Sequence, residues 1–152
     1  MIKWLVDFSE EDILREFGPA ESRVLKRIGS ELESLHEFGL AMEKSRQEVA
    51  HLSARQSPGV PKGLWHAVCK QVHELLCTKS TSYAGLRKEL SRKARPLVPT
   101  LVGVISAAVA AQLGLAVGVL VPFVSLCLLA VVRVGKEAWC EYYGRPVQQR
   151  RR

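Results

Sequence analysis

The stretch LVPTLVGVISAAVAAQLGLAVGVLVPFVSLCLLAVVRV at residues 97–134 decides the fold, because its first 36 positions carry no charged side chain. Uncharged apolar runs of about 18 residues or more are candidates for membrane spans, since an ion in hydrocarbon costs several kcal/mol. Pro99 can open a helix that runs to Leu113, where Gly114 stops it. Pro122 can open a second helix, which is expected to continue past Arg133 to about Tyr143. These residues therefore predict an apolar helical hairpin over 97–134.

Small residues recur at four-residue spacing in this hairpin. They form two rows with one member per helical turn. Small side chains let helix backbones approach closely, which matters most in lipid, where no hydrophobic effect drives helix against helix. The residues expected at this contact are Gly103, Ser106, Ala107, Ala110, Ala111, Gly114 and Gly118.

Positive charge flanks the hairpin on both sides. Residues 1–52 carry a net charge of −4, residues 53–96 carry +7 and residues 133–152 carry +4. Basic flanks at both ends of an apolar hairpin predict a membrane protein with both termini in the cytoplasm. Its expected partner is a bilayer with anionic headgroups, which would meet a basic surface formed by Arg87, Lys88, Arg92, Lys93 and Arg95.

Three arrangements of the uncharged stretch remain open. From Pro99 to Leu113 is 15 residues, or about 22 Å of helix, whereas a hydrocarbon core is about 30 Å thick. The first arrangement is a short membrane hairpin that thins the bilayer or oligomerises to relieve the mismatch. The second is a hairpin buried in the core of a soluble cytoplasmic assembly. The third is a single span from Pro99 to about Val121.

The N-terminal half predicts one long helix from Pro19 to about Leu52. Its apolar residues alternate by three and four, which is the spacing of a heptad seam. The helix either lies along other helices in a bundle or pairs with a second copy as a coiled coil in a homo-oligomer. Gly39 and Arg46 interrupt the seam, and its apolar members are Leu25, Ile28, Leu32, Leu35, Met42 and Val49.

The expected fold class is all-α: a helical bundle with one long heptad-patterned helix and a C-terminal apolar helical hairpin. A helical module spans residues 1–95 and is broken at 53–63, a stretch with two Pro and two Gly. Further amphipathic helices are expected from about Trp65 to Cys77 and from Tyr83 to Ala94. Residues 135–152 form a basic amphipathic end and tail.

The four cysteines do not predict a disulfide framework, because no secretory signal peptide is evident, and they suggest thiols in a reducing compartment. His66, Cys69, His73 and Cys77 share one face of a helix. The outer two lie about 16 Å apart along that helix, whereas zinc holds its ligands at about 2.0–2.3 Å. We therefore expect no metal and no other cofactor.

Arg46 and His51 enclose four residues in an Arg-x4-His pattern, which resembles the motif of the helical HEPN ribonucleases. The match covers six residues of the 152. In that family a paired Arg and His act on the 2′-hydroxyl and phosphate of RNA, so the resemblance implies a ribonuclease site at these two positions. The alternative is that Arg46 pairs with Glu43, Glu48 or a neighbouring helix.

No phosphate-binding glycine loop and no nucleophile elbow occurs in the sequence, so no catalytic residue is expected. The expected function is that of an oligomerising membrane-associated protein, whose residues 1–95 bind a protein partner or signal and whose hairpin anchors to or perturbs the bilayer. The alternative is a soluble adaptor or accessory subunit. In that case the hairpin is buried in an assembly and the basic faces bind an acidic protein or nucleic acid.

Overall fold

The computed structural model describes residues 10–52, 60–92 and 98–144. These ranges contain eight α-helices, one short 3-10 helix and no strand, which confirms the all-α helical bundle. The elements in chain order are α2 (Glu10–Leu14), α3 (Pro19–Ile28), α4 (Leu32–Leu52), α5 (Leu64–Cys77), η1 (Thr81–Tyr83), α6 (Ala84–Arg92), α7 (Val98–Leu113), α8 (Val117–Val134) and α9 (Lys136–Gly144).

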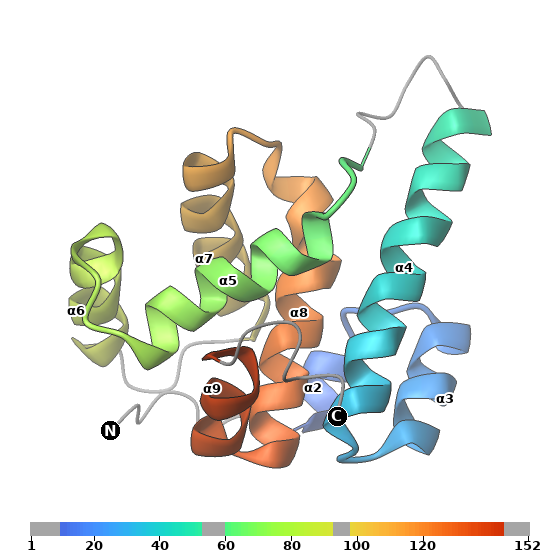
Figure 1. Cartoon of the computed structure of the whole chain (residues 1–152), viewed down its shortest axis with the longest axis horizontal. Coiled ribbons are helices and arrows are strands. Elements are labelled where there is room, and N and C mark those ends of the chain that lie inside the picture. Colours follow the sequence, from blue (N-terminus) through green and yellow to red (C-terminus); the bar gives the residue numbers. More distant parts are fainter. Residues whose placement is uncertain (1–9, 53–59, 93–97, 145–152) are drawn as a thin grey trace.

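Helix α8 runs through the middle of the molecule (Figure 1) and contacts α2, α4, α5, α7 and α9. The nine consecutive side chains from Phe123 to Val131 are each at most 3% exposed. Nine residues make about two and a half helical turns, so α8 is enclosed in every direction over this length. The hairpin thus shares one core with the helices of residues 10–92, whereas the sequence suggested a separate unit.

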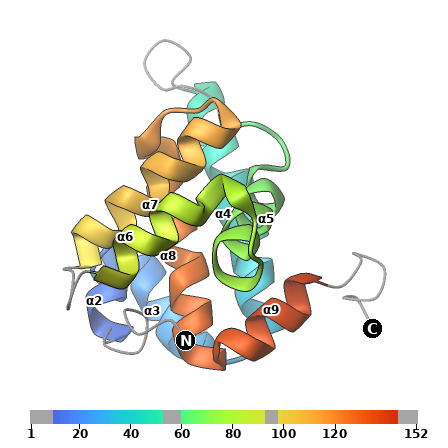
Figure 2. The ribbon, with the colours of Figure 1, turned by 90° about the vertical axis from the view of Figure 1, so that its left-hand side faces the viewer.

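The hairpin is formed by α7 and α8, which lie side by side (Figure 2). Leu101, Ile105 and Val109 point from α7 into the core. The observed hairpin differs from the predicted one at two points. Helix α8 begins at Val117, five residues before Pro122, and it ends at Val134, where Gly135 takes a positive φ of 92° and separates it from α9.

Within the described ranges, α8 is the one helix long and apolar enough to cross a membrane, with a mean hydropathy of 2.5. Length and composition alone meet this criterion, and the core helix of a soluble protein meets it equally. Just over half of that helix, 56%, is buried by the chain itself.

The long heptad-patterned helix is interrupted. Helix α3 ends at Ile28, and Gly29 adopts a φ of 67°, a left-handed conformation that glycine takes without steric cost. Helix α4 then starts at Leu32. The predicted continuous helix from Pro19 to Leu52 is therefore wrong. Apolar residues spaced by three and four do not reveal a short turn when the same apolar face continues after it.

The heptad seam faces the interior of the chain. Leu25, Leu35 and Met42 are buried, and Ile28 and Leu32 are partly buried against the same core. The side chain of Val49 lies outside the described part. The described members of the seam therefore make contacts within one chain, which agrees with the interpretation of a helix lying along others in a bundle.

Gly39 interrupts the seam because the indole of Trp65 occupies the space beside it. A Cβ atom built on Gly39 would lie 2.2 Å from Cε2 of Trp65. Trp65 itself is fully buried on α5. The missing side chain on α4 therefore lets the largest side chain of α5 reach the core.

Helix α5 is capped at its start by a carboxylate from α4. The backbone N–H of Trp65 donates to Oε1 of Glu43 at 2.6 Å, and that of Gly63 approaches Oε2 at 3.4 Å. An acidic group at a helix N-terminus satisfies otherwise unpaired N–H groups and opposes the helix dipole. Glu43 is buried, so this capping bond ties α4 to α5 inside the bundle.

Two glycine-to-alanine substitutions test this packing. We expect Gly39→Ala to lower the free energy of unfolding by about 1–3 kcal/mol, because the new methyl group would overlap Trp65. Gly103→Ala is the matched control in α7, where an added Cβ meets nothing within 4 Å. We expect it to raise stability by about 0.5–1 kcal/mol through helix propensity. Urea unfolding measures both, and equal effects would contradict the close approach.

Candidate functional site

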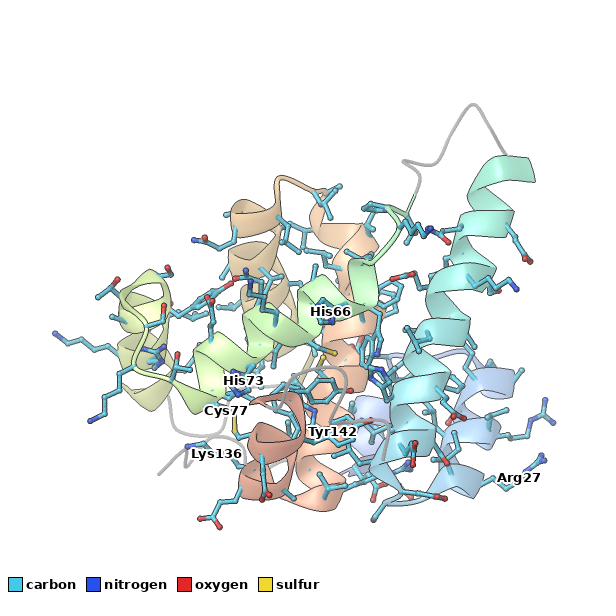
Figure 3. All side chains as sticks on the ribbon, in the orientation of Figure 1. Arg27, His66, His73, Cys77, Lys136 and Tyr142 are labelled. Carbon is cyan, nitrogen blue, oxygen red and sulfur yellow. A yellow bond between two sulfur atoms is a disulfide. The ribbon has the colours of Figure 1, made fainter. Side chains whose placement is uncertain are left out.

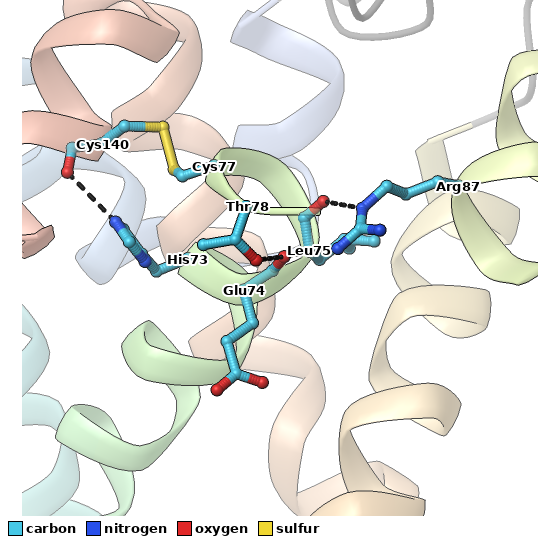
Figure 4. Close-up of a disulfide and its surroundings, with 7 residues drawn as sticks. All are labelled: His73, Glu74, Leu75, Cys77, Thr78, Arg87 and Cys140. Carbon is cyan, nitrogen blue, oxygen red and sulfur yellow. Dashed lines mark hydrogen bonds between the residues drawn. A yellow bond between two sulfur atoms is a disulfide. The ribbon is translucent and has the colours of Figure 1, made fainter. Parts of the chain in front are cut away.

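The basic surface expected before the hairpin is only partly exposed. Arg87 is turned inward and donates from Nε to the carbonyl of Leu75, from Nη1 to that of Ser80 and from Nη2 to that of Glu74, at 2.7–2.8 Å. It therefore caps the C-terminus of α5, where a cation also opposes the helix dipole (Figure 4). The prediction that Arg87 belongs to a lipid-facing surface is therefore corrected, because its guanidinium binds carbonyls of the chain itself.

Among the remaining members of the basic surface, the structure describes the side chain of Lys88, which is exposed on α6. The side chain of Arg92 and the whole of Lys93 and Arg95 lie outside the described residues. The structure therefore leaves one described cation, Lys88, available to a partner at this surface.

Arg133 borders the uncharged stretch on the other side and is also used within the fold. Its side chain is only 4% exposed, and Nε forms a salt bridge with Glu10 of α2. Nη1 donates to the carbonyls of Leu25 at 2.6 Å and Gly29 at 2.9 Å. One guanidinium at the end of α8 thus fixes α2 and caps α3. This contact was not predicted from the sequence; the signal that could have indicated it is a single arginine at the end of an apolar run.

We expect Arg133→Leu to lower the free energy of unfolding by about 2–4 kcal/mol, because two carbonyls and a carboxylate lose their buried partner. Lys136→Ala serves as the control, since Lys136 is exposed one turn later. Thermal or urea unfolding measures the difference. A loss below about 0.5 kcal/mol would show that the network does not hold α2 and α3.

The small residues of the hairpin divide into two groups. Ser106 and Ala110 are buried on the inner side of α7. Ala107 and Ala111 are exposed, and a Cβ on Gly103 or Gly118 would meet nothing within 4 Å. Gly114 has a φ of 69° and makes the turn between the helices. Close packing between α7 and α8 therefore does not involve Gly103, Ala107, Ala111 and Gly118, which lie on outward surfaces.

The most distinctive cluster of polar side chains lies beneath α9. We call it the aromatic–thiol cluster, and its members come from α4, α5, α8 and α9: His36, Trp65, Cys69, Cys127, Trp139 and Tyr143. The indole N–H of Trp65 donates to Nδ1 of His36 at 3.1 Å. The hydroxyl of Tyr143 lies 2.9 Å from the same nitrogen. Because an indole can only donate, Nδ1 acts as an acceptor here.

The two thiols of the cluster are buried and close together. Sγ of Cys69 lies 3.9 Å from Sγ of Cys127. Burial raises the pKa of the Cys127 thiol well above its usual value, and the hydrogen bond with Cys69 adds to this effect. Burial likewise raises the pKa of the Tyr143 hydroxyl, with a further contribution from the two thiols. A protonated thiol is a poor nucleophile, so the raised pKa makes Cys127 unreactive in this buried position.

The other two cysteines form a disulfide between α5 and α9. Cys77 and Cys140 are bonded, with their Cα atoms 5.7 Å apart (Figure 4). His73, one turn before Cys77, lies with Nε2 3.2 Å from the carbonyl oxygen of Cys140. The expectation of four thiols is therefore wrong for this pair. Sequence spacing could not reveal it, because the partners are 63 residues apart and meet only through the packing of α9.

The four residues that share one face of α5 have different surroundings, and Figure 3 labels three of them, His66, His73 and Cys77. His66 is exposed, Cys69 is buried, His73 is half-buried and Cys77 is in the disulfide. Among the described residues, no group of three or more His, Cys, Asp or Glu side chains is arranged to hold a metal ion.

Arg46 pairs with a neighbouring helix. Its Nη2 lies 3.8 Å from Oε2 of Glu21 on α3. This is the alternative that the sequence left open beside the ribonuclease motif. The side chain of His51 lies outside the part of the chain that the structure describes.

Buried tyrosines predict a loss of stability at alkaline pH. Burial, assisted by Glu74, raises the pKa of Tyr83 to about 12, while an unfolded tyrosine titrates near 10. A folded-state pKa that is raised contributes stability fully present below pH 10, and this contribution is lost as the pH rises from about 10 to about 12. We therefore expect the free energy of unfolding to fall over this range.

The measurement compares urea unfolding at pH 8, 10 and 11.5. Tyr83→Phe should be less stable at pH 8, because the hydroxyl donates to Gln71, and should lose less stability between pH 10 and 11.5. Tyr143→Phe should flatten the same range. Parallel curves for the parent and both variants would refute the assignment.

Comparisons of the chain with protein-family models, with curated proteins and with solved structures find no match.

Proposed function

We propose that the chain is a non-enzymatic helical interaction protein, an adaptor or accessory subunit, in which the uncharged hairpin forms the core of a water-soluble bundle. The observation that supports this proposal is the enclosure of α8, where nine consecutive side chains are at most 3% exposed. A helix that already buries its whole circumference against protein gains nothing from lipid over that length.

Two of the basic residues that flank the hairpin support the same proposal. Arg87 and Arg133 are engaged with carbonyls and a carboxylate of the chain itself. Headgroup binding requires basic side chains that reach the membrane surface. Two cations committed to capping helices inside the bundle do not serve that purpose.

The partner surface that we propose is the outward side of α7. Its exposed residues are Thr100, Ala107, Ala111 and Gln112, and none is charged. Short side chains there allow a second helix to approach closely, so the expected homo-oligomer would form through two copies of this surface. Lys88 on α6 offers a cation for an acidic protein beside it.

A second candidate function is favoured by a different observation. Helix α8 has the length and apolarity of a membrane span, and Val117 at its start is 41% exposed. In this case the chain is a membrane-associated protein whose hairpin anchors to or perturbs the bilayer. For α8 to reach lipid, α2, α4, α5 and α9 would first have to leave it, which exposes their own buried faces.

The experiment that separates the two candidates is expression without detergent, followed by sedimentation of membranes. We expect the chain in the supernatant, as a species of defined mass by light scattering, and expect it to stay unbound in flotation with vesicles containing phosphatidylserine. Recovery only with membranes or detergent would overturn the soluble proposal and favour the membrane candidate.

A pair of lysine substitutions in α7 sharpens the test. Ala107→Lys places a charge on the exposed side, so the fold should persist and any dimer should dissociate to a monomer. Ile105→Lys places the charge at a position with 0% exposure and should unfold the bundle. If the hairpin lay in lipid, both substitutions would be strongly unfavourable.

A further inference from the structure

Both cysteine pairs start from α5 and lead to neighbouring helices. Cys77 joins α5 to α9 through the disulfide, and Cys69 lies 3.9 Å from Cys127 of α8. Cys69 and Cys77 are eight residues apart, or about 12 Å along the helix. The bonded pair is half-buried, whereas the thiol pair is buried. The outer pair is therefore accessible to reagents that cannot reach the inner one.

Helix α9 covers the inner pair. Trp139 of α9 is fully buried, and Tyr143 contacts Cys69 and bonds to His36. The helix has nine residues and follows Gly135, whose positive φ makes a turn between α8 and α9. Removing α9 from this position would open the aromatic–thiol cluster while leaving the contacts of α8 with α2, α4 and α7 in place.

We propose that the Cys77–Cys140 disulfide is a redox clasp that holds α9 closed over the buried Cys69 and Cys127 thiols, and that its reduction makes this dithiol reactive. The reductant is a thiol compound or a protein dithiol. A thiolate attacks one sulfur of the disulfide, and the other cysteine leaves as a thiolate that takes up a proton. A second thiol resolves the mixed disulfide, so two external thiols become one disulfide and Cys77 and Cys140 each gain a hydrogen.

The disulfide gives α9 a covalent tie to α5. A nine-residue helix is too short to be stable alone. Its noncovalent attachments to α5 and α8 include the packing of Trp139, and its tyrosines Tyr142 and Tyr143 contact His36. Those contacts can break and re-form, whereas the covalent bond keeps the end of α5 and α9 together. Cutting the bond lets α9 separate from α5 while the helices between the two cysteines keep their packing.

The test measures alkylation of individual cysteines by iodoacetamide under native conditions, followed by mass spectrometry. The oxidised parent chain is compared with Cys77→Ser/Cys140→Ser, which lacks the clasp and needs no reductant. We expect Cys69 and Cys127 to react at least tenfold faster in the variant. The parent treated with dithiothreitol and then freed of it by desalting should show the same increase.

Local opening must be distinguished from unfolding of the whole chain. Circular dichroism should show retained helix in the variant, and the alkylation rate of Cys69 should depend only weakly on urea, as expected for a small opening. The proposal is overturned if the inner thiols stay protected in both reduced forms. It is equally overturned if they react only at the rate of global unfolding, or if loss of the disulfide unfolds the bundle, because the bond would then stabilise the whole fold.

Discussion

The apolar segment of α8 from Phe123 to Val131 must be kept from water, and the rest of the structure follows from that constraint. Only Arg133 among the 18 residues of α8 is charged, and nine consecutive side chains are buried. A helix that is apolar on every side needs neighbours on every side. The amphipathic helices α2, α4, α5 and α9, together with α7, supply them, and each contributes its own apolar face to the same core.

Polar groups at helix ends connect these layers. Glu43 caps the start of α5, Arg87 caps its end, and Arg133 caps the end of α3. In each case the capping side chain comes from a different helix, so one contact satisfies backbone groups and also fixes the relative position of two elements. Arg87 and Arg133, two of the basic residues on either side of the uncharged stretch, are thereby used within the fold.

Periodicity was sufficient to predict the helices but not their neighbours. The hairpin, the amphipathic helix ending at Cys77 and the apolar seam were all predictable, because each depends on spacing within one segment. The turn at Gly29 was missed since the apolar face continues across it, and the role of Gly39 was missed since Trp65 is 26 residues away. The aromatic–thiol cluster and the disulfide bring together residues from four helices. The spacing of residues within one helix does not indicate which other helices it will contact. Whether an uncharged helix lies in lipid or protein likewise depends on the faces that surround it.

The position of α8 along the chain has a consequence for biosynthesis. Helix α8 follows α2, α4, α5 and α7 in the chain, so these helices leave the ribosome before their central neighbour is complete. Until then α4 and α5 carry apolar faces with nothing to cover them. Such nascent surfaces are the substrates of chaperones, and they aggregate when translation pauses or the chain is truncated. The helices that precede α8 therefore depend on a segment synthesised after them to cover their apolar faces.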